Sequence, residues 1–168
     1  MMSAADKRAG SLKGGYTLVK ETGKLTHILL AAGSEVGMAV EAAKTLGQGC
    51  RVVSMPCVEA FERQPEAYRK EVLPNREITT AAEAGVTSAW YKYAAKVLGV
   101  DSFGLSAPGD QVCNHICNHI CNHNHICNHI CNHICNRICN HIGLSAPGDQ
   151  VFEAKGITAA NLVKLAKA

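Results

Sequence analysis

The side chains of this chain that could bind a metal are concentrated in one tract, residues 112–142. The tract reads VCNHICNHICNHNHICNHICNHICNRICNHI and holds seven of the nine cysteines and seven of the eight histidines. Thiolates and imidazoles are the ligands that zinc prefers in proteins. The candidate zinc ligands are Cys113, His115, Cys117, His119, Cys121, His123, His125, Cys127, His129, Cys131, His133, Cys135, Cys139 and His141. Two hypotheses follow: a metal-binding or thiol-reactive protein, or an ordinary domain that carries an unusual insertion.

The pattern of the tract favours the second hypothesis, an ordinary domain with an unusual insertion. The repeating unit is Cys-Asn-His-Ile. The Cys-x-His spacing within it is not usual for a structural zinc site, but the spacings Cys-x3-Cys and His-x3-His, which are usual, recur many times. On an extended strand every cysteine and histidine would share one face, because all of them occupy odd positions. On a helix the four-residue period would drift by about 40° per unit and give no fixed face. Such dense ligands chelate soft metals to some degree in any conformation.

The edges of the tract are marked by a perfect duplication. The nonapeptide GLSAPGDQV occurs at 104–112 and again at 143–151, an offset of 39 residues. Removing 104–142 or 113–151 yields the same sequence, DSFGLSAPGDQVFEAKGITAANLVKLAKA. We interpret 104–142 as a tandem expansion inside a shorter ancestral gene. The predicted organisation is a tail at 1–12, one domain formed by 13–103 and 143–168, and an insertion at 104–142.

Outside the tract, short apolar runs alternate with amphipathic segments, which predicts an α/β domain with a mainly parallel sheet and flanking helices. Ser34 is expected to cap a helix that Gly47 ends, and Thr158 to open a terminal helix with one apolar stripe. Strands are predicted at 25–33, 51–56, 77–85 and 96–101, helices at 34–47 and 57–74 (one or two), and a short helix or turn at 87–94.

Composition narrows the class of protein further. The chain has 168 residues, 47% of them hydrophobic and 18% charged, which is sufficient for one domain with a buried core. A net charge of +3 without a dense Lys/Arg run gives no reason to expect a nucleic-acid partner. No apolar run is long enough for a membrane span, and the polar start predicts a cytoplasmic protein with reduced cysteines.

Five long phrases then resemble one family, the C-terminal domain of transketolase. They are KGGYTLVKETG, HILLAAGSEVGMAVEAAKTLG, RVVSMPCVEAFERQPEAYRKEVLP, AEAGVTSAWYKY and FGLSAPGDQVF, and they come in the order of the family. The resemblance covers roughly residues 13–103 and 143–168. The chain departs from the family in three ways: it starts where the linker into this domain starts, it carries the insertion, and Asn161 stands where an acidic residue is usual.

The resemblance implies a two-carbon ketol transfer between sugar phosphates, with thiamine diphosphate and a divalent metal such as Mg²⁺ as cofactors. In the family the cofactor lies between the first two domains of a dimer, on a Gly-Asp-Gly motif. The only comparable stretches here are PGDQ at 108–111 and 147–150, and neither fits. We therefore assign no catalytic or cofactor-binding residue. The expected role is a structural and assembly module, packed in a homodimer or against the remaining transketolase domains. The alternatives are a metal-binding protein and a fragment that completes a transketolase in trans.

A few other residues could do chemistry, and each has a plain structural explanation. Gly33 and Ser34 lie between a strand and a helix, where anions often bind, but a tight turn with a helix cap is the preferred interpretation. Glu83 could act as a base, although no partner is visible in the sequence. The remaining residues are interpreted as core or interface groups: Cys50 and Cys57, His27, and the aromatic residues Trp90, Tyr91 and Tyr93.

Overall fold

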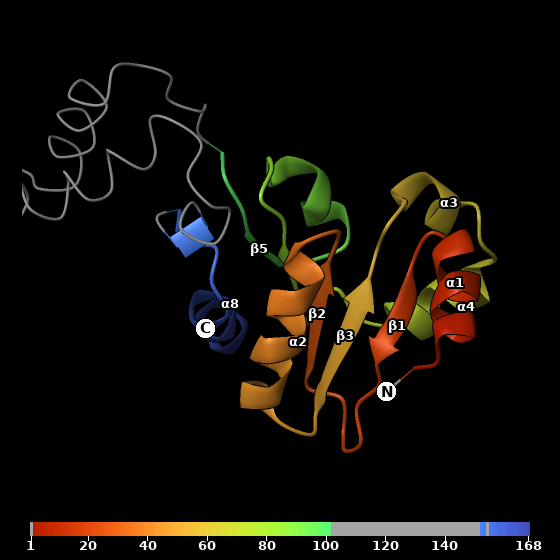
Figure 1. Ribbon diagram of the computed structural model, residues 1–168, viewed down its shortest axis with the longest axis horizontal. Coiled ribbons are helices and arrows are strands. Elements are labelled where there is room, and N and C mark those ends of the chain that lie inside the picture. Colours follow the sequence, from red (N-terminus) through yellow and green to blue (C-terminus); the bar gives the residue numbers. More distant parts are fainter. Residues whose placement is uncertain (1, 102–151, 154) are drawn as a thin grey trace, which may run out of the picture. The chain divides into compact units, whose positions relative to one another are not determined.

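The structure is a computed structural model that describes residues 2–101, 152–153 and 155–168. The chain divides into two compact units, one formed by residues 1–101 with 156–168 and the other by 102–155. Figure 1 shows the first unit, a sheet flanked by helices. The Cys-Asn-His-Ile repeat and both copies of GLSAPGDQV lie outside the described residues.

The centre of the fold is a five-stranded sheet with the order β1-β3-β2-β4-β5. Neighbouring strands run parallel except β1, which pairs antiparallel with β3. This confirms the predicted α/β class with a mainly parallel sheet. All four predicted strands are present but shorter than expected. The strands are β1 (Tyr16–Val19), β2 (His27–Ala31), β3 (Cys50–Ser54), β4 (Thr79–Ala82) and β5 (Lys96–Leu98).

The helices are α1 (Ala4–Leu12), α2 (Glu35–Leu46), α3 (Val58–Glu62), α4 (Glu66–Val72), the 3-10 helix η1 (Ser88–Lys92) and α8 (Ala159–Lys167). Gly47 ends α2 with a positive φ of 87°, and the Thr158 hydroxyl accepts a hydrogen bond from the Asn161 N–H at 3.2 Å, as expected. Within the described ranges, no helix is both long and apolar enough to cross a membrane.

The capping role predicted for Ser34 is wrong. Ser34 precedes α2, but its backbone is already helical (φ −67°, ψ −28°) and its side chain makes no capping bond. An N-cap needs an extended backbone to aim its oxygen at the free N–H groups of the first turn. Instead, the Ser34 hydroxyl donates to Oε1 of Glu35 at 2.9 Å.

Two elements were not predicted from the sequence. Helix α1 lies inside the segment interpreted as a tail, and its start is fixed because the Ser3 hydroxyl accepts from the Asp6 N–H at 3.1 Å and donates to the Asp6 carboxylate at 2.6 Å. The pattern S-x-x-D at 3–6 is the sequence signal of such a capping box. Strand β1 is only four residues long, and its antiparallel pairing with β3 could not be read from local sequence.

Alternate residues of the sheet build two separate cores. On one face Ile28 and Leu30 pack with α3, α4 and η1, and the cluster includes Phe61 and Trp90. On the other face Leu29 and the alanines of α2 pack with Leu162 of α8. Figure 1 shows α2 and α8 together on the same side of the sheet. Both faces are therefore covered by helices of the chain itself, and the described residues of the first core all precede the insertion.

Candidate functional site

The carboxyl ends of β2 and β4 form the edge where a doubly wound sheet usually binds its ligand. The two strands are paired in register through Ala31 and Ala82. The chain leaves β2 toward α2 and β3 on one side, whereas β4 lies on the other side, so the connections diverge here. Such a divergence leaves a crevice outside the strand ends, and ligands of α/β proteins gather there. Gly33, with φ +52°, makes the turn after β2.

Two carboxylates occupy this edge. Glu35 begins α2 and is only 4% exposed, while Glu83 follows β4 and is half-buried. Burial raises the pKa of Glu83 above its ordinary value, and the neighbouring charge of Glu35 raises it further. Neither glutamate forms an ion pair with a lysine or arginine of the described chain. Negative charge at the start of a helix occupies the place that an anion would take.

This arrangement does not fit a bound diphosphate. A phosphate at Gly33 and Ser34 would meet the carboxylate of Glu35, and Oε2 of that carboxylate lies 3.9 Å from the position of an added Cβ on Gly33. The tight-turn interpretation of Gly33 and Ser34 therefore fits better than the anion-binding one. For the same reason this edge offers no place for the diphosphate of thiamine diphosphate, and we derive no chemical step through that cofactor.

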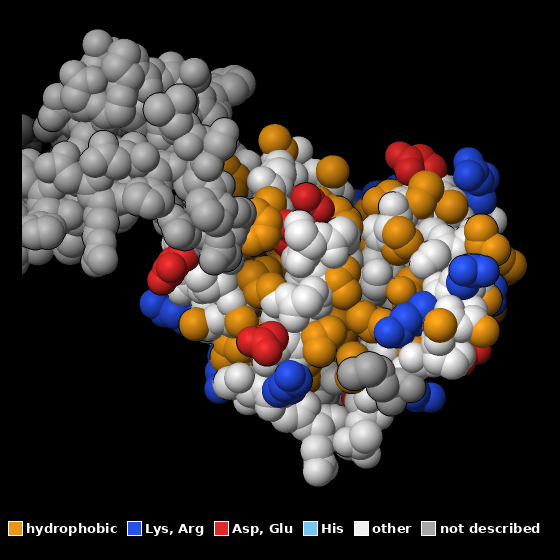
Figure 2. Space-filling view, viewed as in Figure 1, with side chains coloured by type: hydrophobic (Ala, Val, Ile, Leu, Met, Phe, Trp, Pro, Cys, Tyr) orange, Lys and Arg blue, Asp and Glu red, His pale blue; other side chains and the backbone are white. Residues whose placement is uncertain are grey.

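The loop after β4 is held rigidly. The Thr87 N–H donates to Oδ1 of Asp101 at 2.8 Å, and the Thr87 hydroxyl donates to Oδ2 at 2.8 Å. The Val100 N–H donates to the Gly85 carbonyl at 3.0 Å. Between these anchors Val86 is 62% exposed. Figure 2 shows acidic and apolar side chains next to one another at the end of the sheet where α2 begins.

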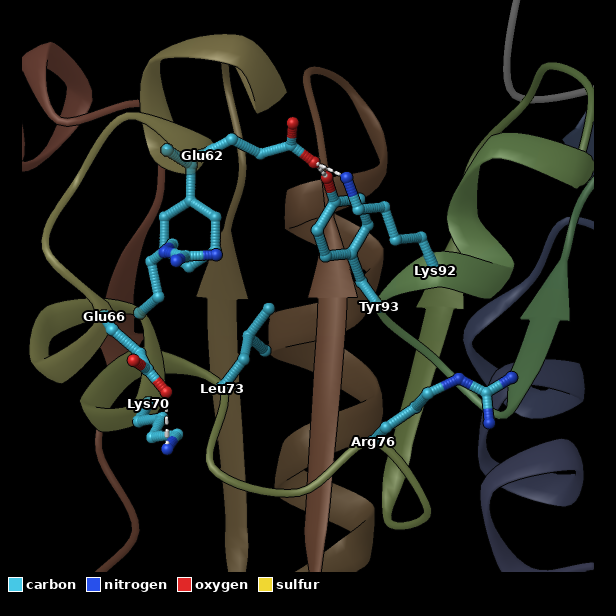
Figure 3. Close-up of a pocket in the computed structure, with 9 residues that line it drawn as sticks. Glu62, Glu66, Lys70, Leu73, Arg76, Lys92 and Tyr93 are labelled. Atoms are coloured by element: carbon cyan, nitrogen blue, oxygen red, sulfur yellow. Dashed lines mark hydrogen bonds and ion pairs between the residues drawn. The ribbon is translucent and has the colours of Figure 1, made fainter.

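A second concave region lies between α3, α4 and η1, with a volume of about 310 Å³ (Figure 3). Phe61, Leu73 and Tyr93 contribute its apolar surface. Its charged lining residues are Glu62, Glu66, Arg69, Lys70, Arg76 and Lys92. Sequence reasoning did not find this pocket, because its residues come from three separate segments and share no spacing that could have signalled it.

The charges of this pocket are largely satisfied by one another. Figure 3 shows Glu62 facing Lys92 and Tyr93, and its carboxylate accepts a hydrogen bond from each. These two donors lower the pKa of Glu62, Lys92 being the larger cause. Lys70 pairs with Glu66 at 2.6 Å. Glu62 thus ties α3 to η1, while the pair of Glu66 and Lys70 lies within α4. Arg69 and Arg76 donate to the carbonyls of Gln64 and Tyr91.

The cysteines and the histidine outside the tract give a mixed result. Cys50 is buried, as expected, and burial raises the pKa of its thiol to about 11. Cys57 is exposed, so its interpretation as a core residue is wrong: it lies in the connection before α3, where the chain has left the sheet. His27 is half-buried, and its Nδ1 lies 2.9 Å from Oγ1 of Thr26.

The aromatic residues around η1 divide by position. Trp90 is buried in the core, Tyr93 is half-buried against Glu62, and Tyr91 is exposed. Across residues 2–101, 152–153 and 155–168, no three His, Cys, Asp or Glu side chains come together as metal ligands would. The predicted zinc ligands at 113–141 and both PGDQ stretches lie outside that part of the chain.

These features define a class: an open, doubly wound α/β domain whose ligand edge carries carboxylates in place of an anion-binding loop. The chain belongs to the family of the transketolase-like TK C-terminal domain, whose family model matches residues 14–117. This confirms the resemblance noted in the sequence.

Similar proteins agree with this assignment. The transketolase of Dictyostelium discoideum is 55% identical over 114 residues, which are 66% of this chain and 17% of that protein. The transketolase of Physarum polycephalum is 53% identical over 110 residues, 63% of this chain and 17% of that one. A solved structure of transketolase from Leishmania mexicana superposes with a TM-score of 0.66 at 31% identity, covering 95% of this chain and 19% of that one. The chain thus spans less than a fifth of the length of these relatives.

Proposed function

We propose that this chain serves as the C-terminal structural and assembly domain of a transketolase, an enzyme that transfers ketol units, and that it is not catalytic by itself. The observation that carries the proposal is the match of this two-faced α/β domain to 17–19% of the length of transketolases. A homodimer, or association with the remaining transketolase domains, is the expected assembly.

The groups at the ligand edge support a role without catalysis. Glu35 places a negative charge in the first turn of α2, which disfavours a phosphate at that helix N-terminus. Thiamine diphosphate and Mg²⁺ would supply the ketol-transfer chemistry of the whole enzyme. Residues of this chain would contribute to that chemistry only by positioning the domains that hold the cofactor.

The test is a ketol-transfer assay on the purified chain with thiamine diphosphate, Mg²⁺, and ketose and aldose phosphates. We expect no turnover. Turnover that scales with the concentration of this protein, in a preparation free of full-length enzyme, would overturn the proposal. Adding a Dictyostelium transketolase that lacks its matching segment tests the alternative of completion in trans, because activity would then require both chains.

A second candidate function is metal binding by the repeat, favoured by fourteen thiol and imidazole groups that all occupy odd positions between 113 and 141. We expect any zinc to be held by these groups rather than by the domain. A cysteine binds zinc as the thiolate, and burial, which raises the pKa of Cys50 to about 11, favours the thiol form at neutral pH. Zinc is measured with a colorimetric chelator on the full chain and on a deletion of 113–142. Stoichiometric zinc on the deleted form would contradict this expectation.

A further inference from the structure

The pocket between α3, α4 and η1 holds more positive than negative charge. Its lining includes two carboxylates and four cationic side chains, the latter being Arg69, Lys70, Arg76 and Lys92. Glu62 accepts a hydrogen bond from Lys92. Glu66 pairs with Lys70 at 2.6 Å, so each carboxylate already has a lysine partner. The positive charge that these two pairs do not balance is carried by the two arginines.

Both arginines are oriented by neutral acceptors. Nε of Arg69 donates to the Gln64 carbonyl at 3.2 Å. Nε of Arg76 donates to the Tyr91 carbonyl at 2.9 Å. A backbone carbonyl fixes the position of a guanidinium group but does not neutralise its charge. Within the described ranges, no carboxylate lies at ion-pair distance from Arg69, and the pair of Arg76 with Glu77 is exposed, so it contributes little.

Arg69 lies close to both carboxylates of the pocket. The pKa of Glu62 is lowered mainly by Lys92, and the charge of Arg69 lowers it further. The pKa of Glu66 is lowered mainly by Lys70, and Arg69 again adds to the effect. An anion that approached Arg69 would therefore meet carboxylates whose charge is already balanced by their lysine partners.

The other lining residues give the pocket an apolar wall, formed by Phe61, Leu73 and Tyr93. Figure 3 shows Leu73 and Tyr93 between Glu66 on one side and Arg76 on the other. The cavity of about 310 Å³ lies within the size range of small-molecule pockets. Its lining thus suits a small ligand that has an anionic group and a carbon part.

We propose that this pocket binds a small phosphate monoester, with Arg69 and Arg76 holding the phosphate, and Leu73 and Tyr93 lying against the carbon part. A phosphate monoester carries about 1.5 to 2 negative charges at neutral pH, which matches two arginines better than a single carboxylate does. A guanidinium group can also donate two parallel hydrogen bonds to phosphate oxygens. This site belongs to the domain itself and goes beyond its proposed assembly role, on which it does not depend.

Binding is measured by isothermal titration calorimetry on the full chain. The probes are glucose 6-phosphate and inorganic phosphate, and glucose is the neutral control. We expect glucose 6-phosphate to bind more tightly than inorganic phosphate, because only the ester has a carbon part that can contact the apolar wall. Glucose should not bind. In NMR spectra of the same chain, glucose 6-phosphate should shift the backbone amides at 69–76 and 88–93.

Substitution of the arginines tests their role directly. Arg69→Gln and Arg76→Gln should each weaken binding of glucose 6-phosphate by about 10- to 100-fold, the usual effect of losing hydrogen bonds to a charged group. Arg69→Lys keeps the charge without the planar donor pair and should recover part of the loss. The matched control is Arg63→Gln, because Arg63 is exposed at the end of α3 and does not line the pocket. Thermal unfolding of each variant checks that it is folded.

A variant with the opposite expected effect separates binding from folding. Glu66→Gln removes a negative charge from the pocket and releases Lys70 from its pair. That pair is exposed, so its loss should leave the stability of the chain unchanged. Binding of glucose 6-phosphate should tighten by roughly threefold, because the net positive charge of the pocket increases.

The pH dependence distinguishes a phosphate from other anions. The second pKa of a phosphate monoester is about 6, so the ester loses most of its second charge at pH 5, whereas sulfate keeps both charges. None of the nine lining residues is a histidine, and the pKa values of Glu62 and Glu66 are lowered by their lysine partners. Binding of glucose 6-phosphate should therefore weaken between pH 7 and pH 5, and binding of sulfate should not.

Three results would overturn the proposal. The first is glucose 6-phosphate that binds no more tightly than glucose, or that shifts only amides outside 69–76 and 88–93. The second is binding by folded Arg69→Gln and Arg76→Gln that is as tight as binding by Arg63→Gln. The third is binding of the ester that is equal at pH 5 and pH 7, which would exclude a dianionic phosphate as the ligand. None of these measurements involves ketol transfer, so the assembly role is tested separately.

Discussion

Two groups of buried or half-buried charged side chains lie at opposite ends of the same sheet. They differ in whether each carboxylate is paired with a cation of the described chain. Near the amino ends of the parallel strands, Arg51 on β3 donates Nε and Nη2 to both carboxylate oxygens of Glu21, at 2.8 and 2.6 Å. Its Nη1 donates to the carbonyls of Glu71 and Val72, at 2.6 and 3.1 Å. Beyond the carboxyl ends, Glu35 and Glu83 have no cation among the described residues.

The difference separates a charged pair whose bonds are complete within the chain from carboxylates whose burial no described cation balances. Arg51 satisfies the last carbonyls of α4 and joins that helix to β3 and to the β1–β2 connection, so its bonds are complete within the chain. The pKa of Glu21 is accordingly lowered, mainly by its hydrogen bond with Arg51. The pKa of Glu83 is raised, because its burial and the charge of Glu35 outweigh the backbone hydrogen bonds from Gly85 and Ala84. Each prediction below tests one side of this contrast.

The largest effect is expected from Arg51→Ala. The substitution leaves Glu21 as a buried, unpaired carboxylate and leaves two helix-terminal carbonyls without a donor, which together cost about 3–5 kcal/mol of the free energy of unfolding. Denaturant unfolding of the purified chain measures the loss. Arg51→Lys, which keeps the charge but cannot make the bidentate bond, should recover less than half of it. A loss below about 1 kcal/mol for Arg51→Ala would mean that this pair is not part of the fold's stability.

A smaller loss is expected from Glu21→Gln, about 2 kcal/mol, because the charge-assisted bonds to Arg51 become weaker without a cavity being formed. The matched control is Glu66→Gln, which breaks the exposed pair with Lys70 and should have no measurable effect. The same denaturant titration reads both variants. Equal losses in the two would show that burial does not distinguish the pairs.

The fold was largely accessible from the sequence, because its signals are local. The apolar run at β2 and the Thr158 cap of α8 can be predicted from residue type and spacing. The partner of Arg51 was not accessible, since Glu21 is 30 residues away and only the sheet brings the two together. Glu83 could be singled out as a possible base, but its neighbour Glu35 is 48 positions earlier, and no local pattern relates them.

The Cys-Asn-His-Ile repeat is a case in which a clear local pattern does not predict a position in the fold. Its residues carry the plainest chemical signal in the sequence, whereas the described residues of the two cores lie between 19 and 98 and in α8. A dense set of ligands in sequence thus predicts chemistry without predicting a position in a fold. The pocket between α3, α4 and η1 is the reverse case, a position in the fold without a sequence pattern.

Deleting residues 104–142 is expected to leave both sets of charge unchanged and to stabilise the chain slightly. The connection from 102 to 155 shortens by 39 residues, which reduces the entropy cost of closing it by about 1 kcal/mol. The melting temperature should therefore rise by a few degrees. The anchors on either side, Asp101 on Thr87 and the Thr158 cap, are retained. A deletion form that melts several degrees lower, or does not fold, would show that the insertion contributes to the core.

The smallest effect expected is a pH dependence that has opposite signs at the two ends of the sheet. Glu21 has a lowered pKa, so its contribution to stability is complete above the ordinary glutamate value, near 4.3, and is lost as the pH falls through the lowered pKa. Glu83 has a raised pKa, so its contribution is complete below the ordinary value and is lost as the pH rises through the raised pKa. Between about pH 4 and 7, the stability of the wild-type chain relative to Glu83→Gln should therefore fall. The stability of the wild-type chain relative to Glu21→Gln should rise as the pH increases through the lowered pKa of Glu21, and should then stay level. Denaturant unfolding of the three proteins across this range measures both differences. A difference from Glu83→Gln that does not change with pH would mean that Glu83 is compensated within the free chain, and the contrast between the two ends of the sheet would then be lost.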